Sequence, residues 1–325
     1  MNPIDILDNV GTTPLVKLKM DTHLNLNVYA KLEFSNPTGS VKDRAASYLL
    51  KTLLERKEIN NETTIIESTS GNFGIALAAY CKKNGLAFIA VVDPNIQPVN
   101  EMLIRSFGAQ IVKVTVPDVN GGYLLTRIKK VKEILATIKN SYWVNQYSNL
   151  LNANAYFTTL GDEICKSFDK VDYLFMGISS GGTITGVSQK IKQQFPKAKI
   201  IAVDIEGSVI FGGSPQKRFI PGIGSSMRPV ILQSAFIDEH ILISEKATID
   251  GCKDLLKYEN IFAGGSSGSV YMAIKKYFTT HEYIEGSTVV TLFPDRGERY
   301  IDTIYNEKWC SKFQIEKDVR NIKIS

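Results

Sequence analysis

Histidine and cysteine are scarce in this chain of 325 residues. It has three histidines and four cysteines, and none of them shows the spacing of a metal site, a C-x-x-C redox pair or a histidine-based triad. The sequence therefore predicts no metal centre, and any chemistry must use other side chains. Cysteines that lie far apart are typical of a cytoplasmic protein with reduced thiols.

Long apolar runs and a strong excess of one charge are also missing. Runs such as 87–92 are far shorter than the roughly 20 apolar residues that span a bilayer, and the first residues lack the features of a signal peptide. Lys and Arg exceed Asp and Glu by only 38 to 33, too little to indicate nucleic-acid binding. We therefore expect a cytoplasmic protein with neither a membrane nor a nucleic-acid partner.

Short β-branched runs alternate with longer segments of helical periodicity. The predicted strands are 28–33, 64–68, 87–93, 110–115, 142–145, 173–178, 200–205, 240–244 and 288–293. The predicted helices are 41–58, 71–83, 99–107, 123–138, 152–168, 183–194, 247–258 and 269–278. This alternation predicts an α/β fold with mostly parallel sheets flanked by helices. The length suggests two domains, and the lack of a Pro-rich linker suggests that they are interwoven.

Three turns rich in Gly, Ser and Thr, at 67–72, 177–183 and 263–269, are predicted to follow strands and to open helices. Such turns present backbone N–H groups and the positive end of a helix dipole to anions. The chain has no G-x-G-x-x-G, and the P-loop spacing that begins at Gly181 lacks its Lys. NAD and ATP are therefore disfavoured, while a small cofactor with one phosphate remains open.

The segment 36–44 places a lysine at the start of a predicted helix. Asn36 and Pro37 indicate a turn, and Ser40 is a suitable N-cap. Lys42 then lies in the first helical turn, where the dipole disfavours a cation and lowers its pKa. A neutral lysine can form an imine, but a solvated Lys42 paired with Asp43 or Glu33 would explain the same pattern.

Taken together, these motifs resemble the fold-type II pyridoxal phosphate (PLP) enzymes, most closely the cysteine synthase and cystathionine β-synthase group. They occur in that family's order and extend from 11–15 to 297–300. The resemblance implies a fold like that of the tryptophan synthase β-subunit, with twisted, mostly parallel sheets. It also implies a smaller mobile domain at 40–148, a larger PLP-binding domain formed by 1–39 and 149–325, and a homodimer.

The resemblance implies roles for the motif residues. Lys42 would hold PLP as a Schiff base, Asn72 would hydrogen-bond its ring hydroxyl, and Ser266 would face its ring nitrogen. A neutral serine there keeps this nitrogen unprotonated, which suits β-elimination. The residues implied to bind the substrate carboxylate are Thr69, Ser70 and Gln146. The turn implied to bind the phosphate consists of Ser179, Ser180, Gly181, Gly182 and Thr183.

Three departures from the cysteine synthase pattern point to one branch of the family. Tyr147 follows Gln146 where a Phe is usual, Ser179 replaces a Gly, and the segment 117–127 is unlike that of cysteine synthases. These features resemble the branch that makes N-(2-amino-2-carboxyethyl)-L-glutamate, a 2,3-diaminopropionate precursor for siderophores. Tyr147, Ser179 and Arg127 would add donors for the carboxylates of L-glutamate or for a leaving phosphate.

Each of these three residues also has a structural explanation. Arg127 could lie on a solvated helix face, Tyr147 could be a half-buried aromatic, and Ser179 could cap a helix.

The expected reaction is PLP-dependent β-replacement of O-phospho-L-serine by L-glutamate. A cysteine synthase or cystathionine β-synthase that uses O-acetylserine or O-phosphoserine is the alternative. A catalytically silent paralogue that binds PLP or a partner protein is the second alternative, although the intact set of Lys42, Asn72 and Ser266 argues against it.

Overall fold

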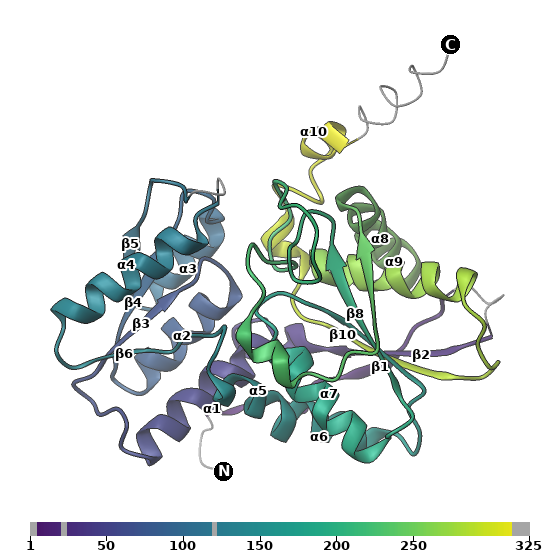
Figure 1. The fold of residues 1–325 in the computed structure, drawn as a ribbon, viewed down its shortest axis with the longest axis horizontal. Helices are drawn as coiled ribbons and strands as arrows, with labels where there is room; N and C mark the ends of the chain where they lie inside the picture. The colour runs from purple at the N-terminus through teal and green to yellow at the C-terminus, as the bar shows by residue number, and fades with distance from the viewer. Residues whose placement is uncertain (1–4, 21–24, 119–121, 314–325) are drawn as a thin grey trace.

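The computed structural model describes residues 5–20, 25–118 and 122–313. Two sheets organise this part of the chain (Figure 1). The larger sheet has the order β1–β2–β10–β7–β8–β9, and the smaller sheet has the order β5–β4–β3–β6. The strands are β1 (Leu15–Lys17), β2 (Asn27–Leu32), β3 (Thr64–Ser68), β4 (Ala87–Val92), β5 (Gln110–Lys113), β6 (Ser141–Trp143), β7 (Tyr173–Gly177), β8 (Lys199–Ile205), β9 (Glu239–Ile243) and β10 (Thr288–Phe293).

The described strand pairs are parallel, apart from the antiparallel pair of β1 with β2. The predicted α/β class with mostly parallel sheets is therefore confirmed. β10 lies between β2 and β7, so that Thr291, late in the chain, is opposite Ala30, early in it. This pairing brings residues just after β2 close to residues just after β10.

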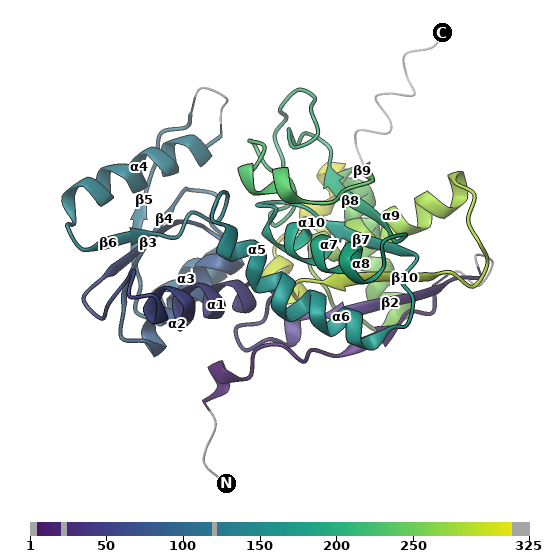
Figure 2. The same cartoon turned by 60° about the horizontal axis from the view of Figure 1, so that its bottom comes forward.

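Helices cover both faces of each sheet. In Figure 2, α4 lies on one side of the smaller sheet, and α2 and α3 lie on the other side. On the larger sheet, α8 and α9 pack against one face and α7 packs against the opposite face. The helices are α1 (Lys42–Glu55), α2 (Asn72–Lys83), α3 (Pro98–Ser106), α4 (Leu124–Thr137), α5 (Leu150–Tyr156), α6 (Asp162–Ser167), α7 (Gly182–Gln194), α8 (Glu245–Glu259), α9 (Gly265–Thr280) and α10 (Glu307–Cys310). Short turns are η1 (Ile6–Asp8), η3 (Glu33–Ser35), η5 (Val230–Ser234), η6 (Gly297–Tyr300) and η7 (Ser311–Phe313), and η4 (Phe157–Gly161) is a π-helix.

Strand β7 shows why the larger sheet is covered on both faces. Successive side chains of a strand point to opposite faces, and in β7 both sets are apolar. Leu174 and Met176 belong to one apolar cluster with Ile184 of α7. Phe175 belongs to another cluster and packs edge-on against Tyr277 of α9, with ring centres 5.4 Å apart.

One apolar cluster extends from the smaller sheet to the larger sheet. It contains Ile65 and Phe88 of the smaller sheet, Leu49 of α1 and Leu174 of β7. Helices α1 and α5 contact each other within this region. The two sheets are therefore joined through a continuous core.

Strand β1 and the helix predicted at 152–168 are two of the places where the structure differs from the prediction. Strand β1 was not predicted because its three residues show no clear alternation. The helix predicted at 152–168 is instead α5, η4 and α6 in succession. Here the hydroxyls of Thr158 and Thr159 donate to carbonyl oxygens four residues earlier, and a β-carbon on Gly161 would lie 2.7 Å from the side chain of Lys190. The hydrogen bonds of these hydroxyls and the close packing of Gly161 against α7 thus accompany the wider turn of the π-helix η4.

Within the described residues, each helix falls short of the length and apolar character that a membrane crossing requires.

Candidate active site

Two of the three predicted turns follow strands and open helices. β3 ends at Ser68 and α2 begins at Asn72, while β7 ends at Gly177 and α7 begins at Gly182. The strand predicted before the third turn is absent. Only residues 260–264 separate α8 from α9, which is too short for a paired strand, and Ala263 forms a single isolated bridge. Helix α9 consequently begins at Gly265 rather than at Ser269, the predicted start.

Lys42 is the first residue of α1. The Oγ of Ser40 accepts a hydrogen bond from the Lys42 N–H at 3.3 Å, although Val41 rather than Ser40 is the N-cap residue. Burial lowers the pKa of Lys42 to about 8, and the negative charge of Asp295 partly opposes this shift. The lowered pKa was predicted, but desolvation is its main cause.

The two acids proposed as partners of Lys42 are bonded to other groups. Oδ2 of Asp43 accepts hydrogen bonds from the N–H and the hydroxyl of Thr38. Glu33 is buried and pairs with Arg44 at 2.7 Å. The structural explanation of Lys42 through pairing with Asp43 or Glu33 is therefore wrong.

Asp295 is a buried carboxylate near both Lys42 and Asn72. Its Oδ2 accepts hydrogen bonds from Nδ2 of Asn72 at 2.7 Å and from the hydroxyl of Tyr300 at 2.9 Å. Burial raises the pKa of this carboxyl, while the charges of Arg299 and Lys42 and these hydrogen bonds lower it. Within the described residues, its Oδ1 is buried without a hydrogen-bond partner. Asp295 thus links two predicted cofactor-binding residues.

The turn before α7 is tightly enclosed. Gly181 has a φ of 88°, in the left-handed region that favours glycine. A β-carbon on Gly181 would lie 2.8 Å from Leu232 of η5, and one on Gly182 would lie 2.5 Å from the side chain of Asn152. Backbone N–H groups at this turn can therefore approach a ligand closely, as an anion site at a helix N-terminus requires.

The side chains of this turn connect it to the other predicted residues. Ser180 is buried, and the hydroxyl of Ser179 donates to the carbonyl of Gly224 at 3.1 Å. Thr183 lies close to the hydroxyl of Tyr156, and the ring centre of Tyr156 is 5.9 Å from Nζ of Lys42. The turn and the lysine are therefore on the same side of α5.

Ser266 lies in the first turn of α9 and is buried. It is next to the end of β7, because a β-carbon on Gly177 would lie 3.5 Å from Cβ of Ser266. The hydroxyl offers a neutral donor and acceptor at this place.

Arg127 of α4 lies against the turn that follows β3. Its Nη1 donates to Oγ of Ser70 at 3.2 Å, and its Nε is 3.3 Å from the carboxylate of Asp93. Only 12% of its side chain is exposed, so the explanation as a solvated helix face is wrong. Thr69, next to Ser70, is also buried. Residues 119–121 of the distinctive segment 117–127 lie outside the described residues.

Gln146 and Tyr147 follow β6 at the carboxyl end of the smaller sheet. The backbone N–H of Gln146 donates to Glu67 and its side-chain amide donates to the carbonyl of Ser68, both at 3.3 Å. Burial raises the pKa of Glu67 to about 7. Tyr147 is half-buried; burial raises its hydroxyl pKa, which the charge of Arg127 lowers in part.

Sequence reasoning assigned no role to Asp295 or Glu67. Glu67 occupies the penultimate position of a buried strand, and Asp295 follows β10 after a single proline. A carboxylate at the carboxyl end of an apolar strand could have indicated both, because ligands of α/β proteins bind at that edge.

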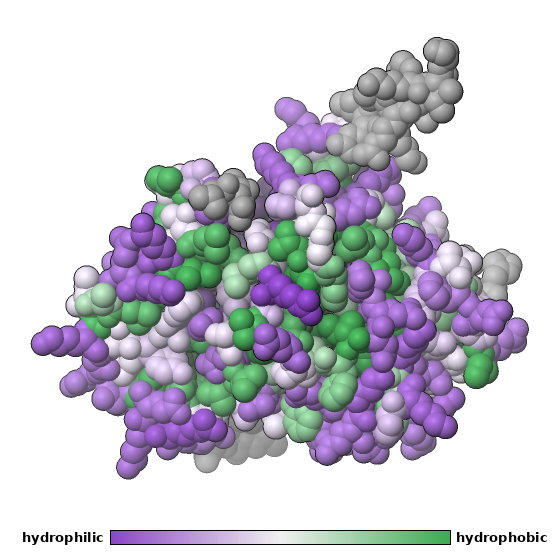
Figure 3. Space-filling model, viewed as in Figure 1, coloured by the Kyte–Doolittle hydropathy of each residue, from purple (hydrophilic) through white to green (hydrophobic). Residues whose placement is uncertain are grey.

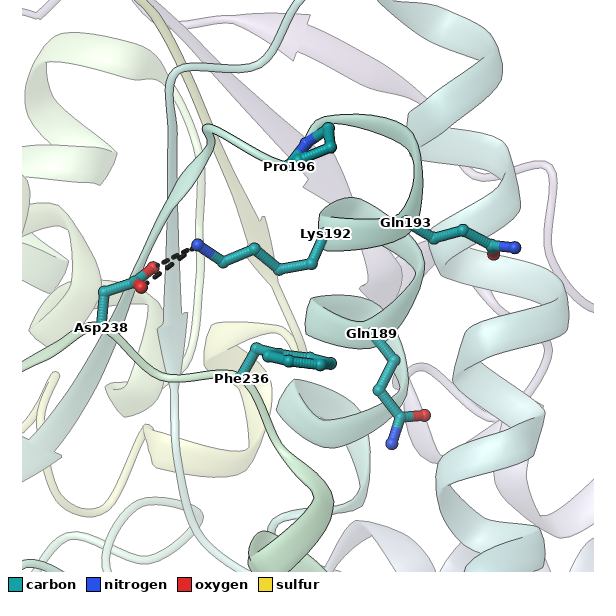
Figure 4. A pocket seen from close by; sticks show the side chains of 6 residues that line it. All are labelled: Gln189, Lys192, Gln193, Pro196, Phe236 and Asp238. Atoms are coloured by element: carbon teal, nitrogen blue, oxygen red, sulfur yellow. Dashed lines mark hydrogen bonds and ion pairs between the residues drawn. The ribbon is translucent and has the colours of Figure 1, made fainter.

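A separate pocket lies at the other end of α7 (Figure 4). An ion pair of 2.9 Å between Lys192 and Asp238 closes one side of it. The lining residues are Gln189, Lys192, Gln193, Pro196, Phe236 and Asp238. None of the predicted site residues lines this pocket.

Comparisons with known proteins identify the family of this chain. The family model described as pyridoxal-phosphate dependent enzyme matches residues 6–295. An O-acetylserine dependent cystathionine β-synthase from Helicobacter pylori is 35% identical with a TM-score of 0.87, covering 94% of this chain and 100% of that one. An O-ureido-L-serine synthase is 28% identical, with a TM-score of 0.84 and coverage of 94% and 96%. A hydrogen sulfide-producing enzyme from Fusobacterium nucleatum is also 28% identical, with a TM-score of 0.85 and coverage of 92% and 99%.

Proposed function

This chain belongs to the family of pyridoxal-phosphate dependent enzymes that carry out β-replacement, and from that premise we propose its substrates. It replaces the phosphate of O-phospho-L-serine with the α-amine of L-glutamate. The product is N-(2-amino-2-carboxyethyl)-L-glutamate, a precursor of 2,3-diaminopropionate for siderophore biosynthesis. The proposal rests above all on Arg127, a guanidinium held at the turn where the amino-acid substrate would lie.

The residues present fit PLP. Lys42 has a lowered pKa, and the turn before α7 has no space for side chains at Gly181 and Gly182. A helix N-terminus with such glycines suits a phosphate. Lys42 would hold the aldehyde carbon, Asn72 the ring hydroxyl and Ser266 the ring nitrogen.

PLP, when bound, withdraws electrons from the α-carbon of an attached amino acid. The chain's own groups would handle the protons and the anions. Lys42 would remove the α-proton and return it after the nucleophile has added. The bond between Cβ and the phosphate oxygen breaks, and phosphate leaves with the electron pair. A new bond then joins Cβ to the nitrogen of glutamate, which gives up one proton, so that the released phosphate is protonated directly or through solvent.

The positive charge of Arg127, next to the residues that would bind the substrate, favours phosphoserine over O-acetylserine. Thr69, Ser70 and Gln146 would bind the α-carboxylate of the amino acid. Arg127 is a permanent cation whose planar fork matches phosphate oxygens. Asp93 holds this guanidinium in place and neutralises part of its charge, while Tyr147 and Ser179 add hydroxyl donors for glutamate.

A second candidate is a cystathionine or cysteine synthase. The similarity to an O-acetylserine dependent cystathionine β-synthase at 35% identity favours it. It would use sulfide or the thiol of homocysteine as the nucleophile, in place of the amine of glutamate.

We further propose that the chain is a homodimer and that residues 40–148 move relative to 1–39 and 149–325 when substrate binds. Residues 40–148 include Thr69, Ser70 and Gln146, so their movement would bring these groups to the amino acid. Such closure excludes water from the reaction.

The test uses purified enzyme loaded with PLP. Phosphoserine is added with L-glutamate, sulfide or L-homocysteine in parallel, and product is identified by mass spectrometry while phosphate release is followed. We expect product with glutamate, and a loss of turnover of about 10³-fold or more in Lys42→Ala, which lacks the general base.

Lys51→Ala is the matched control, since Lys51 lies on the same helix with 75% of its side chain exposed. Turnover with sulfide or homocysteine but not glutamate would establish the second candidate instead. Wild-type turnover in Lys42→Ala would contradict both.

A further inference from the structure

Arg218 carries a guanidinium whose donors are only partly used. It lies in the segment between β8 and η5, outside the predicted turns and motifs. Its Nη2 donates to Oγ of Ser226 at 2.9 Å. Across the described part of the chain, its Nη1 is buried without a hydrogen-bond partner. An unsatisfied buried donor on a charged group is costly, and a bound anion would relieve this cost.

Two contacts place this guanidinium beside the predicted site. A β-carbon on Gly224 would lie 2.7 Å from Nη1 of Arg218, and the carbonyl of Gly224 accepts the hydrogen bond from Ser179. Gly224 is thus next to both Arg218 and Ser179, and Ser179 belongs to the turn that would bind phosphate. The charge of Arg218, like that of Arg127, also acts on the hydroxyl of Tyr147.

The neighbouring acids leave this donor available. The charges of Asp204 and Glu245 act on Arg218, but no ion pair within 4 Å joins Arg218 to an acid among the residues described. Oδ1 of Asp204 accepts the N–H of Ile205, and Oε1 of Glu245 accepts the backbone N–H groups of Phe219 and Ile220. Backbone N–H groups thus bind to an oxygen of each of these acids.

We propose that Arg218 is a specificity-determining residue that binds a carboxylate of the incoming nucleophile. This inference rests on the proposed function, in which Arg127 serves the leaving phosphate and Thr69, Ser70 and Gln146 serve the carboxylate of the first amino acid. The carboxylates of glutamate are the anions that remain to be bound. A guanidinium with a free N–H is suited to a carboxylate because of its planar fork.

The experiment compares Arg218→Gln with the wild-type holoenzyme. Phosphate release from phosphoserine is measured first without nucleophile, as a single-turnover burst. Steady-state rates then follow with L-glutamate and with 2-mercaptoethanol, a nucleophile without a carboxylate. We expect an unchanged burst, a kcat/KM for glutamate that falls at least 10-fold through KM, and an unchanged rate with the thiol. Arg218→Lys, which retains the charge, should recover part of the loss.

Arg228→Gln is the control, because Arg228 is exposed on the same segment. An unchanged KM for glutamate in Arg218→Gln overturns the inference, and so does an equal loss with glutamate and the thiol, which would mark a structural role. If the wild type releases phosphate but does not consume glutamate, the proposed function fails and the inference falls with it. If the wild type consumes glutamate and Arg218→Gln does so equally well, only the inference fails.

Discussion

At the scale of single residues, the chemistry of Lys42 depends on a balance between burial and one carboxylate. Removal from water favours the neutral amine, whereas the charge of Asp295 favours the ammonium. The result is a pKa of about 8. A lysine near that value has a substantial neutral fraction at physiological pH, and only the neutral amine can attack an aldehyde.

We expect the uptake of PLP by the apoenzyme to accelerate as pH rises through about 8, the folded pKa of Lys42. Asp295→Asn removes the charge that raises this pKa, so the midpoint should move to lower pH. The measurement is the initial rate of cofactor absorbance change between pH 6 and pH 10. Asp302→Asn, at an exposed position on the same segment, should leave the midpoint where it is. A midpoint that rises in Asp295→Asn would disprove this account.

At the scale of elements, buried strands were predicted best. The bounds of β3 and β10 agree with the prediction to the residue, because both are apolar, β-branched runs with clear ends. The start of α9 was wrong because glycines that usually mark turns here form the first helical turn. Asp295 was given no role because its partner Asn72 lies 223 positions away in sequence, and only the fold brings them together.

The turn before α7 predicts a large effect for a small substitution. In Gly181→Ala, the added β-carbon would lie 2.8 Å from the side chain of Leu232. Alanine would also be strained by the backbone φ of 88° at this position. We expect a loss of about 2–4 kcal/mol in unfolding free energy, from strain and overpacking together, and weaker PLP retention. Urea unfolding and cofactor absorbance after dialysis are the measurements.

Gly286→Ala separates the two causes, because Gly286 has φ 76° but open space around it. Backbone strain alone should lower the free energy of unfolding of this variant by about 1 kcal/mol, and its PLP retention should be unchanged. Equal losses in the two variants would contradict the role assigned to packing around the turn.

At the scale of the whole molecule, a buried ion cluster ties distant segments together. Arg44 of α1 pairs with Glu33 after β2 and with Glu163 of α6, and Lys31 of β2 also pairs with Glu163 at 2.8 Å.

On the face of the molecule that Figure 3 shows, apolar residues gather towards the middle and mainly hydrophilic residues lie along the lower rim.

The cluster predicts a specific loss of stability in acid. Burial alone would raise the pKa of Glu163, but the hydrogen bonds and charges of Arg44 and Lys31 hold it at about 2. A lowered folded pKa stabilises the protein above the unfolded value of 4.5, and this contribution disappears as pH falls towards 2. Glu163→Gln should therefore lower the free energy of unfolding at pH 7 by about 1–3 kcal/mol, less than the full roughly 1.4 kcal/mol per pKa unit because Glu163 is partly exposed to solvent, and by progressively less below pH 4.

Urea unfolding of wild type and Glu163→Gln at several pH values measures this difference. Glu55→Gln is the control, since Glu55 forms a surface pair with Lys51 and 63% of its side chain is exposed; its effect should be below about 1 kcal/mol. A difference for Glu163→Gln that stays constant down to pH 3 would contradict the assignment.

The pairing of β2 with β10 also has a consequence for biosynthesis. A ribosome makes Lys42 before Asp295, so Asp295 emerges only after β2 and the strands from β3 to β10 have been made. During elongation, β2 lacks its parallel neighbour, and the pocket around Lys42 lacks the carboxylate that balances its charge. Capture of the cofactor with native affinity then has to await the synthesis of Asp295, and the strand edge of β2 stays open until β10 has been made.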